Sequence, residues 1–254
     1  MPGNEVQIAR YLIANIGRIS LPHLGVIRSV GTPRRGPSYT LITDVHDANK
    51  ISSPDATKKA DIYLNSIGVS LKQTGGSFAF NRIQRANIQD LFRQLKFPNI
   101  DFKLQRLDIE VKRFHEGLLE RRNRPWRDLF NEEDFKTLLN FLMMKGSPNL
   151  GISDHQAELI LEASMETTST RMSVYSFEEY FSKYKGKFKV AIRRQWIGQA
   201  SNSEHSRAIS LARKPGNAPW VFRNIVGSPT SGWRGGFPLN LRKTVYFLMI
   251  EKER

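Results

Sequence analysis

Asp61 and Lys72 stand at the edges of two short apolar runs that are close together in the chain. The runs and the turn residues between them predict two antiparallel strands, 61–65 and 68–73. If the strands pair through a tight turn at Ser66-Ile67, Asp61 lies opposite Lys72. An acid and a lysine brought together in this way are suited to chemistry on a charged substrate.

Side chains alternate along a strand, so Ser70 and Lys72 are expected on one face, with the carbonyl group of Leu71 beside them. Carboxylate and carbonyl oxygens are the ligands that Mg²⁺ prefers, and a lysine can offset charge that develops on a phosphate. The spacing therefore fits a metal-dependent phosphodiesterase in which Asp61 and the Leu71 carbonyl hold the metal. It also fits an ordinary cross-strand ion pair worth less than ~1 kcal/mol.

The charge of the chain is strongly positive, with 39 Lys and Arg against 24 Asp and Glu and a net charge of +15. From Lys183 to Arg254 there are 15 Lys and Arg but three acids. Such a field attracts polyanions, which points to nucleic acid as the partner. The sequence contains no run of about 18 apolar residues, so no membrane span is expected. The absence of Cys is consistent with a cytoplasmic protein.

The periodicity of apolar residues predicts a mixture of helices and strands. Helices are expected at 4–16, 79–95, 103–122, 132–144 and 154–164. Strands are expected at 39–45, 61–65, 68–73, 187–200 and 243–252. Asn4 and Asn131 are expected caps, and Ser153 with Gln156 a capping box. This order predicts an α+β or mixed α/β fold, with a central mixed β-sheet flanked by helices.

Several polar residues are placed to contact DNA. Gln73 and Asn81 lie beside the expected site and are candidates for base edges, while Arg82 and Arg85 suit the phosphate backbone. In the Gly-rich loop SPTSGWRGGFP, Arg234 is the first candidate for reading guanine, with Ser231 and Trp233 beside it. The lysines expected to meet phosphates are Lys183, Lys185, Lys187 and Lys189.

The stretches NEVQIARYL, KADIYL and SLK, with the FNR segment that follows, resemble the PD-(D/E)xK nucleases. Within them, the chain is most similar to small type II restriction endonucleases of the MspI-like group, which cut short sites. In that group an N-terminal Asn-Glu helix precedes a strand-opening Asp. A Gln/Asn/Glu-x-Lys strand and a helix entered through Phe-Asn follow. PWVFRN at 219–224 and the basic elements at 227–245 are also reminiscent of the group.

The resemblance implies roles for individual residues. Asp61 matches the metal-binding Asp, Lys72 the catalytic Lys, and Glu5 the helix acid near the metal. Ser70 takes the place of the usual Glu and would hold a water or a phosphate. One carboxylate of the expected set is therefore missing, and Glu5 or Asp90 would have to serve. The implied cofactor is Mg²⁺.

Other candidates for the site are weaker. Pro54-Asp55 spells the literal "PD" of the family, but Asp55 lies in a polar loop with no apolar strand directly after it. Asp61 starts the apolar stretch DIYL and is the better match. The five His residues are scattered and none has metal-ligand spacing, so structural or solvent-facing roles are expected for them.

The sequence thus predicts one PD-(D/E)xK-like domain over 1–254. Residues 1–100 would form the catalytic core, 101–172 a helical section, and 173–254 a basic strand and loop section that binds DNA. The expected function is Mg²⁺-dependent, site-specific cleavage of duplex DNA. The resemblance also implies a cognate DNA methyltransferase in the same cell, and one centre per chain requires a homodimer or sequential nicking. Two alternatives stay open: a repair or junction-resolving nuclease of the same fold, and a non-catalytic basic nucleic-acid-binding protein.

Overall fold

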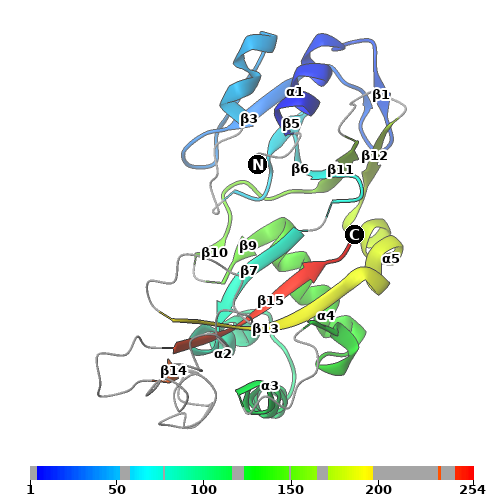
Figure 1. The fold of residues 1–254 in the computed structure, drawn as a ribbon. Coiled ribbons are helices and arrows are strands. Elements are labelled where there is room, and N and C mark those ends of the chain that lie inside the picture. Colours follow the sequence, from blue (N-terminus) through cyan, green and yellow to red (C-terminus); the bar gives the residue numbers. More distant parts are fainter. Residues whose placement is uncertain are drawn as a thin grey trace, which may run out of the picture. The chain divides into compact units, whose positions relative to one another are not determined.

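The computed structural model describes residues 5–51, 58–76, 78–115, 123–148, 150–164, 171–196, 234–235 and 244–254 (Figure 1). The chain divides into two compact units, and neither is a continuous stretch. Unit 1 comprises Met1–Phe78, Lys136–Lys187 and Lys252–Arg254. Unit 2 comprises Ala79–Phe135 and Phe188–Glu251. Both units combine strands with helices, so the expectation of a mixed α/β fold is confirmed.

The centre of unit 1 is a six-stranded sheet with the order β12-β11-β6-β5-β3-β4. Its strands are β3 (Val30–Pro33), β4 (Tyr39–Leu41), β5 (Ile62–Leu64), β6 (Ile67–Gln73), β11 (Leu159–Ala163) and β12 (Met172–Tyr175). β11 runs parallel to β6, and the other neighbouring strands are antiparallel. The sheet is therefore mixed, as the sequence predicted.

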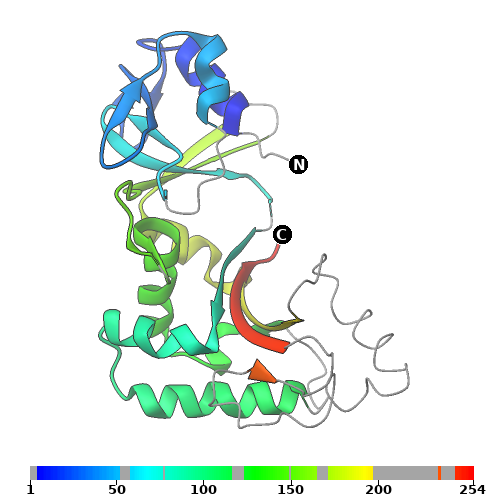
Figure 2. The same cartoon turned by 90° about the vertical axis from the view of Figure 1, so that its left-hand side faces the viewer.

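The remaining elements of unit 1 are short, and two of them cover one face of the sheet. Helix α1 (Glu5–Ala14) lies beside the 3₁₀ helix η1 (Val45–Ile51), as Figure 2 shows. Helix α5 (Phe177–Tyr184) begins at Ser176, whose side chain forms a capping box with Glu179. The other elements are β1 (Ser20–Leu21), β2 (Gly25–Val26), the π-helical turn η3 (Phe141–Lys145), β9 (Gly146–Ser147), β10 (Gly151–Ile152) and the 3₁₀ turn η5 (Lys185–Lys187).

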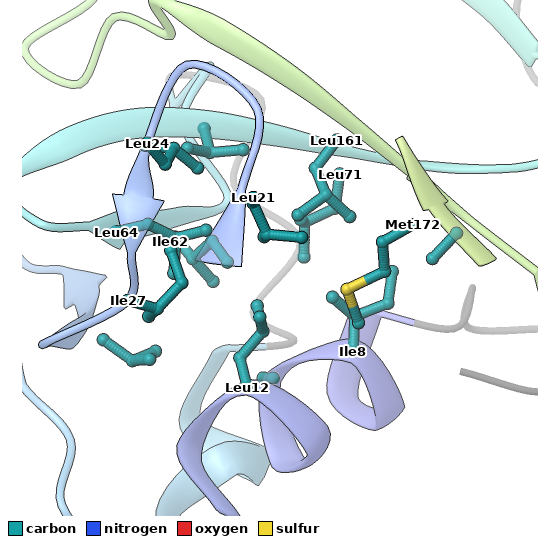
Figure 3. Packing of buried hydrophobic residues seen from close by; sticks show 14 of the residues in the cluster. Ile8, Leu12, Leu21, Leu24, Ile27, Ile62, Leu64, Leu71, Leu161 and Met172 are labelled. Atoms are coloured by element: carbon teal, nitrogen blue, oxygen red, sulfur yellow. The ribbon is translucent and has the colours of Figure 1, made fainter. Parts of the chain in front are cut away.

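The apolar core of unit 1 lies between α1 and the sheet. Ile8 and Leu12 point from α1 toward Leu71 and the other aliphatic side chains of the strands (Figure 3). Both helix residues are fully buried, and burying a side chain of this size contributes about 1.5–3 kcal/mol. This packing fixes which face of β5 and β6 is apolar and leaves their other face for polar groups.

Unit 2 has its own sheet, with the order β14-β15-β13-β8 and β7 paired to β15. Its elements are β7 (Phe78–Gln84), α2 (Arg85–Gln94), α3 (Ile100–His115), β8 (Asn123–Pro125), the 3₁₀ turn η2 (Trp126–Asp128), β13 (Phe188–Trp196), β14 (Arg234–Gly235) and β15 (Thr244–Lys252). Helix α4 (Glu132–Asn140) crosses the boundary between the units. Trp126 stacks on Phe135, with ring centroids 4.7 Å apart, in the aromatic core of this unit.

Three predicted elements differ from the structure. Residues 78–84 form strand β7 rather than the start of a helix, because β7 pairs with β15. Residues 159–163 form β11, and the Ser153–Gln156 capping box is absent because the Ser153 hydroxyl accepts the backbone N–H of His155 at 3.0 Å. The strand at 39–45 ends at Leu41.

Other elements agree with the prediction. α1, β5, β6, α3, β13 and β15 occur near their predicted places. Asn131 caps α4, since its Oδ1 accepts the backbone N–H of Asp134 at 2.7 Å. Asn4, the expected cap of α1, lies outside the described residues. No helix among the described residues is both long and apolar enough to cross a membrane.

The turn between β5 and β6 should be the main local determinant of their pairing. Asn65 has a φ of 51°, and its side-chain amide donates to the carbonyls of Leu24 and Val26 while its oxygen accepts from Arg28. We expect Asn65→Ala to lower the free energy of unfolding by about 2–4 kcal/mol. The variant loses the side-chain hydrogen bonds of Asn65, and alanine tolerates a positive φ less well than asparagine. Asn65→Gly, which tolerates this φ, should lose less. Urea unfolding measures both, and an Asn65→Ala protein as stable as the wild type would contradict this role.

Candidate active site on the β5–β6 hairpin

The two-residue turn Asn65-Ser66 sets the register of the hairpin. Both residues have positive φ, 51° and 70°, as in a type I′ turn, whose twist matches that of the strands. Leu64 then pairs with Ile67 and Ile62 with Val69. The turn lies one residue earlier than the predicted Ser66-Ile67. Asp61 therefore lies opposite Ser70 rather than Lys72, but the shift of two in register keeps all three side chains on one face.

The two faces of the hairpin differ in chemistry. Ile62, Leu64, Val69 and Leu71 are buried in the core on the α1 side. Asp61, Ser70 and Lys72 alternate with them and lie on the opposite face. Ser70 is only 2% exposed, while Asp61 and Lys72 are half-buried. The polar groups are thus partly withdrawn from water, where charge interactions are stronger than at an open surface.

Hydrogen bonds join Asp61, Ser70 and Lys72 into one chain. Asp61 Oδ2 accepts the backbone N–H of Leu71 at 2.6 Å and the Ser70 hydroxyl at 3.3 Å. Lys72 Nζ donates to Ser70 Oγ at 2.8 Å and to the Leu71 carbonyl at 3.0 Å. Ser70 is therefore the bridge between the carboxylate and the ammonium group, a role that differs from that of the metal-binding Glu whose place it takes.

Glu5 and Lys59 bring two further charges near this chain. Burial is the main cause that raises the pKa of Glu5, and the negative charge of Asp61 raises it further, while Lys72 opposes the shift. Burial lowers the pKa of Lys59 to about 8, with the charge of Lys72 also lowering it and Asp61 opposing. Glu5 is the first residue of α1, so the helix brings to the hairpin the acid that the sequence predicted.

The oxygens of this site suit a hard cation only in part. Both Asp61 hydrogen bonds use Oδ2, so Oδ1 and the Glu5 carboxylate are the oxygens suited to a divalent ion. The Leu71 carbonyl, the other predicted ligand, instead accepts a hydrogen bond from the Lys72 ammonium group. Among the described residues, no group of three or more His, Cys, Asp or Glu side chains is arranged to hold a metal. Asp61 and Glu5 are therefore the two carboxylates that a metal at this site would use, with water and substrate completing its coordination.

Glu162 is a neighbouring acid that the sequence did not indicate. It is the parallel partner of Lys72 in the β6–β11 register and is 1% exposed. The hydroxyls of Tyr184 and Tyr180 donate to its carboxylate at 2.5 and 3.4 Å, and Lys183 Nζ lies 3.7 Å away. The continuous apolar run Leu159–Leu161 is the signal of a buried parallel strand that would have placed it. The two tyrosines thus satisfy both oxygens of the buried Glu162 carboxylate.

The other predicted site residues fall into two groups. Gln73 ends β6 with an exposed side chain, and Asp90 is exposed on α2 in unit 2, paired with Arg93 at 3.0 Å. Asn81 and Arg82 lie in β7, Arg85 begins α2 and Arg234 begins β14. The structure does not describe the side chains of these last four. Asp55, Ser231 and Trp233 lie outside the described residues.

Lys59 should make stability depend on pH. Below pH 8 its charged form is held in a buried position, at a cost of up to about 3 kcal/mol. Between pH 8 and about 10.5 the unfolded chain binds more protons at this residue than the folded chain, so the free energy of unfolding rises with pH. Lys59→Met should therefore stabilise the protein most at pH 7, and the gain should shrink by pH 10.

The matched control for this prediction is Lys58→Met, which removes the same charge from the neighbouring, half-buried side chain. Chemical denaturation of both variants and the wild type at pH 7 and pH 10 measures the effect. Equal stability changes for Lys59→Met at the two pH values would show that the buried ammonium group is not the cause.

Comparison with protein-family models gives no match to this chain. A search of curated proteins gives no match either. The function is therefore inferred from the residues and the geometry of the hairpin site.

Proposed function

We propose that the protein is a Mg²⁺-dependent endodeoxyribonuclease of the type II restriction class, with a PD-(D/E)xK-like catalytic core in unit 1. The observation that carries the proposal is the Asp61–Ser70–Lys72 chain on the polar face of the hairpin, with Glu5 nearby. The order of these parts is also that of the resemblance: a helix with an acid, a strand-opening Asp, then a Gln/Asn/Glu-x-Lys strand, in which Ser70 replaces the first residue here. The net charge of +15 supports a polyanionic substrate.

Each residue of the site would have a separate task. Asp61 Oδ1 and Glu5 would hold the metal, and Mg²⁺ when bound would polarise the phosphate and make a water molecule more acidic. Lys72 would place its ammonium group beside the scissile phosphate and offset its developing charge. Ser70 would orient Lys72 through its hydroxyl, and the Leu71 N–H would keep the Asp61 carboxylate in place.

Duplex DNA is the proposed substrate. Gln73 is exposed at the end of β6, one residue beyond Lys72, and is suited to contact the DNA near the cut. The basic segment from Lys183 onward, with Arg234 as its candidate base reader, would supply further contacts. Cutting both strands requires a homodimer or two successive nicks, and a restriction role implies a cognate methyltransferase in the same cell.

A non-catalytic DNA-binding protein is the second candidate, and one observation favours it. Lys72 already donates to both Ser70 and the Leu71 carbonyl, so the polar groups of the hairpin satisfy one another as in a structural network. In that case Asp61 would serve only to hold β5 and β6 together.

The first test compares the wild type with Asp61→Asn on plasmid DNA, with Mg²⁺ and with EDTA. The amide oxygen can still accept the Leu71 N–H, but it is a poor metal ligand, so we expect the cleavage rate to fall at least about 100-fold. Discrete bands that need both Mg²⁺ and Asp61 would support a restriction enzyme. Cleavage confined to branched DNA would indicate a junction-resolving nuclease instead.

Asp101→Asn is the matched control for this test, since it makes the same change at an exposed carboxylate of α3. It should cut at the wild-type rate. Intact plasmid with the wild-type protein at all Mg²⁺ concentrations, together with salt-sensitive DNA binding, would reject the enzyme and leave the binding protein.

Ser70 offers a second test of the same site. Ser70→Ala removes the bridge but leaves the Lys72 contact with the Leu71 carbonyl, so we expect kcat to fall about tenfold with little change in KM. Lys72→Met should lower kcat by at least about 100-fold. Single-turnover cleavage and DNA-binding titrations separate the two constants. A Ser70→Ala enzyme with unchanged kcat would show that the bridge does not position Lys72.

A further inference from the structure

A basic cleft of about 450 Å³ lies in unit 1, apart from the Asp61–Ser70–Lys72 chain. Three cationic side chains line it, Arg34, Arg35 and Lys58, against one acid, Asp154. Both arginines belong to the loop between β3 and β4, whereas Lys58 precedes β5. A hollow with this excess of positive charge and this size suits an anionic group as large as a nucleotide.

His155 holds the walls of the cleft together. Its ring lies 2.7 Å from the carbonyl of Arg34 through Nε2 and 2.7 Å from the Tyr63 hydroxyl through Nδ1. Its own carbonyl accepts the N–H groups of Lys59 and Ala60, each at 2.9 Å. His155 is 2% exposed. The basic loop and the segment before β5 are thus fixed to one buried residue, whose N–H also donates to Ser153, directly after β10.

One residue that lines the cleft, His155, contacts the face of the sheet that carries the proposed catalytic groups. Its partner Tyr63 lies in β5, two residues after Asp61, so the side chains of Tyr63 and Asp61 lie on one face about 6.6 Å apart along it. Phosphates of one DNA strand recur every ~3.4 Å along the duplex axis. A strand with one phosphate at Asp61 could therefore place another, a few nucleotides away, at the arginines.

Two exposed apolar side chains also line the cleft. Leu150 and Ile152 lie at the tip and on the second strand of the β9–β10 hairpin, and they are 60% and 56% exposed. A lining that combines arginines with aliphatic groups matches a nucleotide, which is anionic at the phosphate and largely apolar on the faces of its sugar and base. A small inorganic anion would use only the cationic residues.

We propose that this cleft binds a backbone phosphate of the DNA substrate a few nucleotides from the scissile bond, with Arg34, Arg35 and Lys58 as its cationic contacts. The choice of DNA as the source of the phosphate rests on the proposed function. The site would position the strand without reading its sequence, because phosphate contacts carry no base information.

The test measures DNA binding rather than cleavage, so that it is independent of catalysis. In an Asp61→Asn background with EDTA, Arg34→Gln with Arg35→Gln is compared with the parent by fluorescence anisotropy of a labelled duplex across a range of NaCl concentrations. The slope of log K against log salt should become less steep by about 2, and affinity near 0.15 M salt should fall at least about tenfold. Thermal unfolding confirms that both proteins are folded.

The matched control is Arg18→Gln with Arg28→Gln, two exposed arginines of the same unit that do not line the cleft. The same loss of binding in both pairs would show a general effect of charge and would overturn the proposal. Unchanged DNA binding in the cleft pair would overturn it as well. Binding of inorganic phosphate that the cleft pair loses while DNA binding stays intact would assign the cleft to a small anion instead.

The outcomes separate this proposal from the nuclease proposal. Weaker DNA binding by the cleft pair, in a protein that never cuts DNA with Mg²⁺, would support the cleft and reject the nuclease. Normal DNA binding by the cleft pair, in a protein whose cleavage needs Asp61, would reject the cleft proposal and support the nuclease proposal. A parent protein that does not bind duplex DNA at any salt concentration would overturn both.

Discussion

The register between β5 and β6 is the constraint on which the site depends. Side chains alternate along a strand with a period of two, so a slip of one residue would turn Asp61, Ser70 and Lys72 toward α1 and expose the aliphatic face. Such a slip would bury charges among hydrocarbon side chains and is strongly disfavoured. The positive φ of Asn65 and Ser66 and the contacts of the Asn65 side chain fix the correct pairing locally. The packing of α1 against the opposite face enforces the same register from a distance.

The local pattern of apolar residues correctly predicted those elements in which a single periodicity was clear. The apolar runs beside Asp61 and Lys72 gave the hairpin, and the stripe of aliphatic residues after Glu5 gave α1. Residues 78–84 and 159–163 were misassigned because their strand state comes from partners distant in sequence, β15 for the first and β6 for the second. For the same reason Glu162 and the cleft around His155 could not be located, since they exist only after segments far apart in the chain are brought together.

The charges near the hairpin lower the stability of the fold. Burial and then the nearby charge of Lys72 lower the pKa of Lys59, and burial and then the charge of Asp61 raise the pKa of Glu5. A site built for stability alone would separate like charges or replace them with apolar groups. Perturbed groups of this kind collect where a protein handles charged ligands. Glu162, by contrast, is buried with two tyrosine hydroxyls that donate to its carboxylate.

Unit 1 is built from three separate segments of the sequence, and this affects the order in which it can fold during synthesis. Lys252 is 2% exposed, and its ammonium group donates to the carbonyl of Gly76 at 3.1 Å, across 176 positions of sequence. β6 likewise cannot form its parallel pairing until β11, about 90 positions later, has been synthesised. Contacts this distant in sequence form slowly, because the loop between them must close first. On the ribosome, the hairpin would therefore emerge long before β11 and Lys252, and its full set of neighbours would be in place only when nearly the whole of the sequence shown here has been translated.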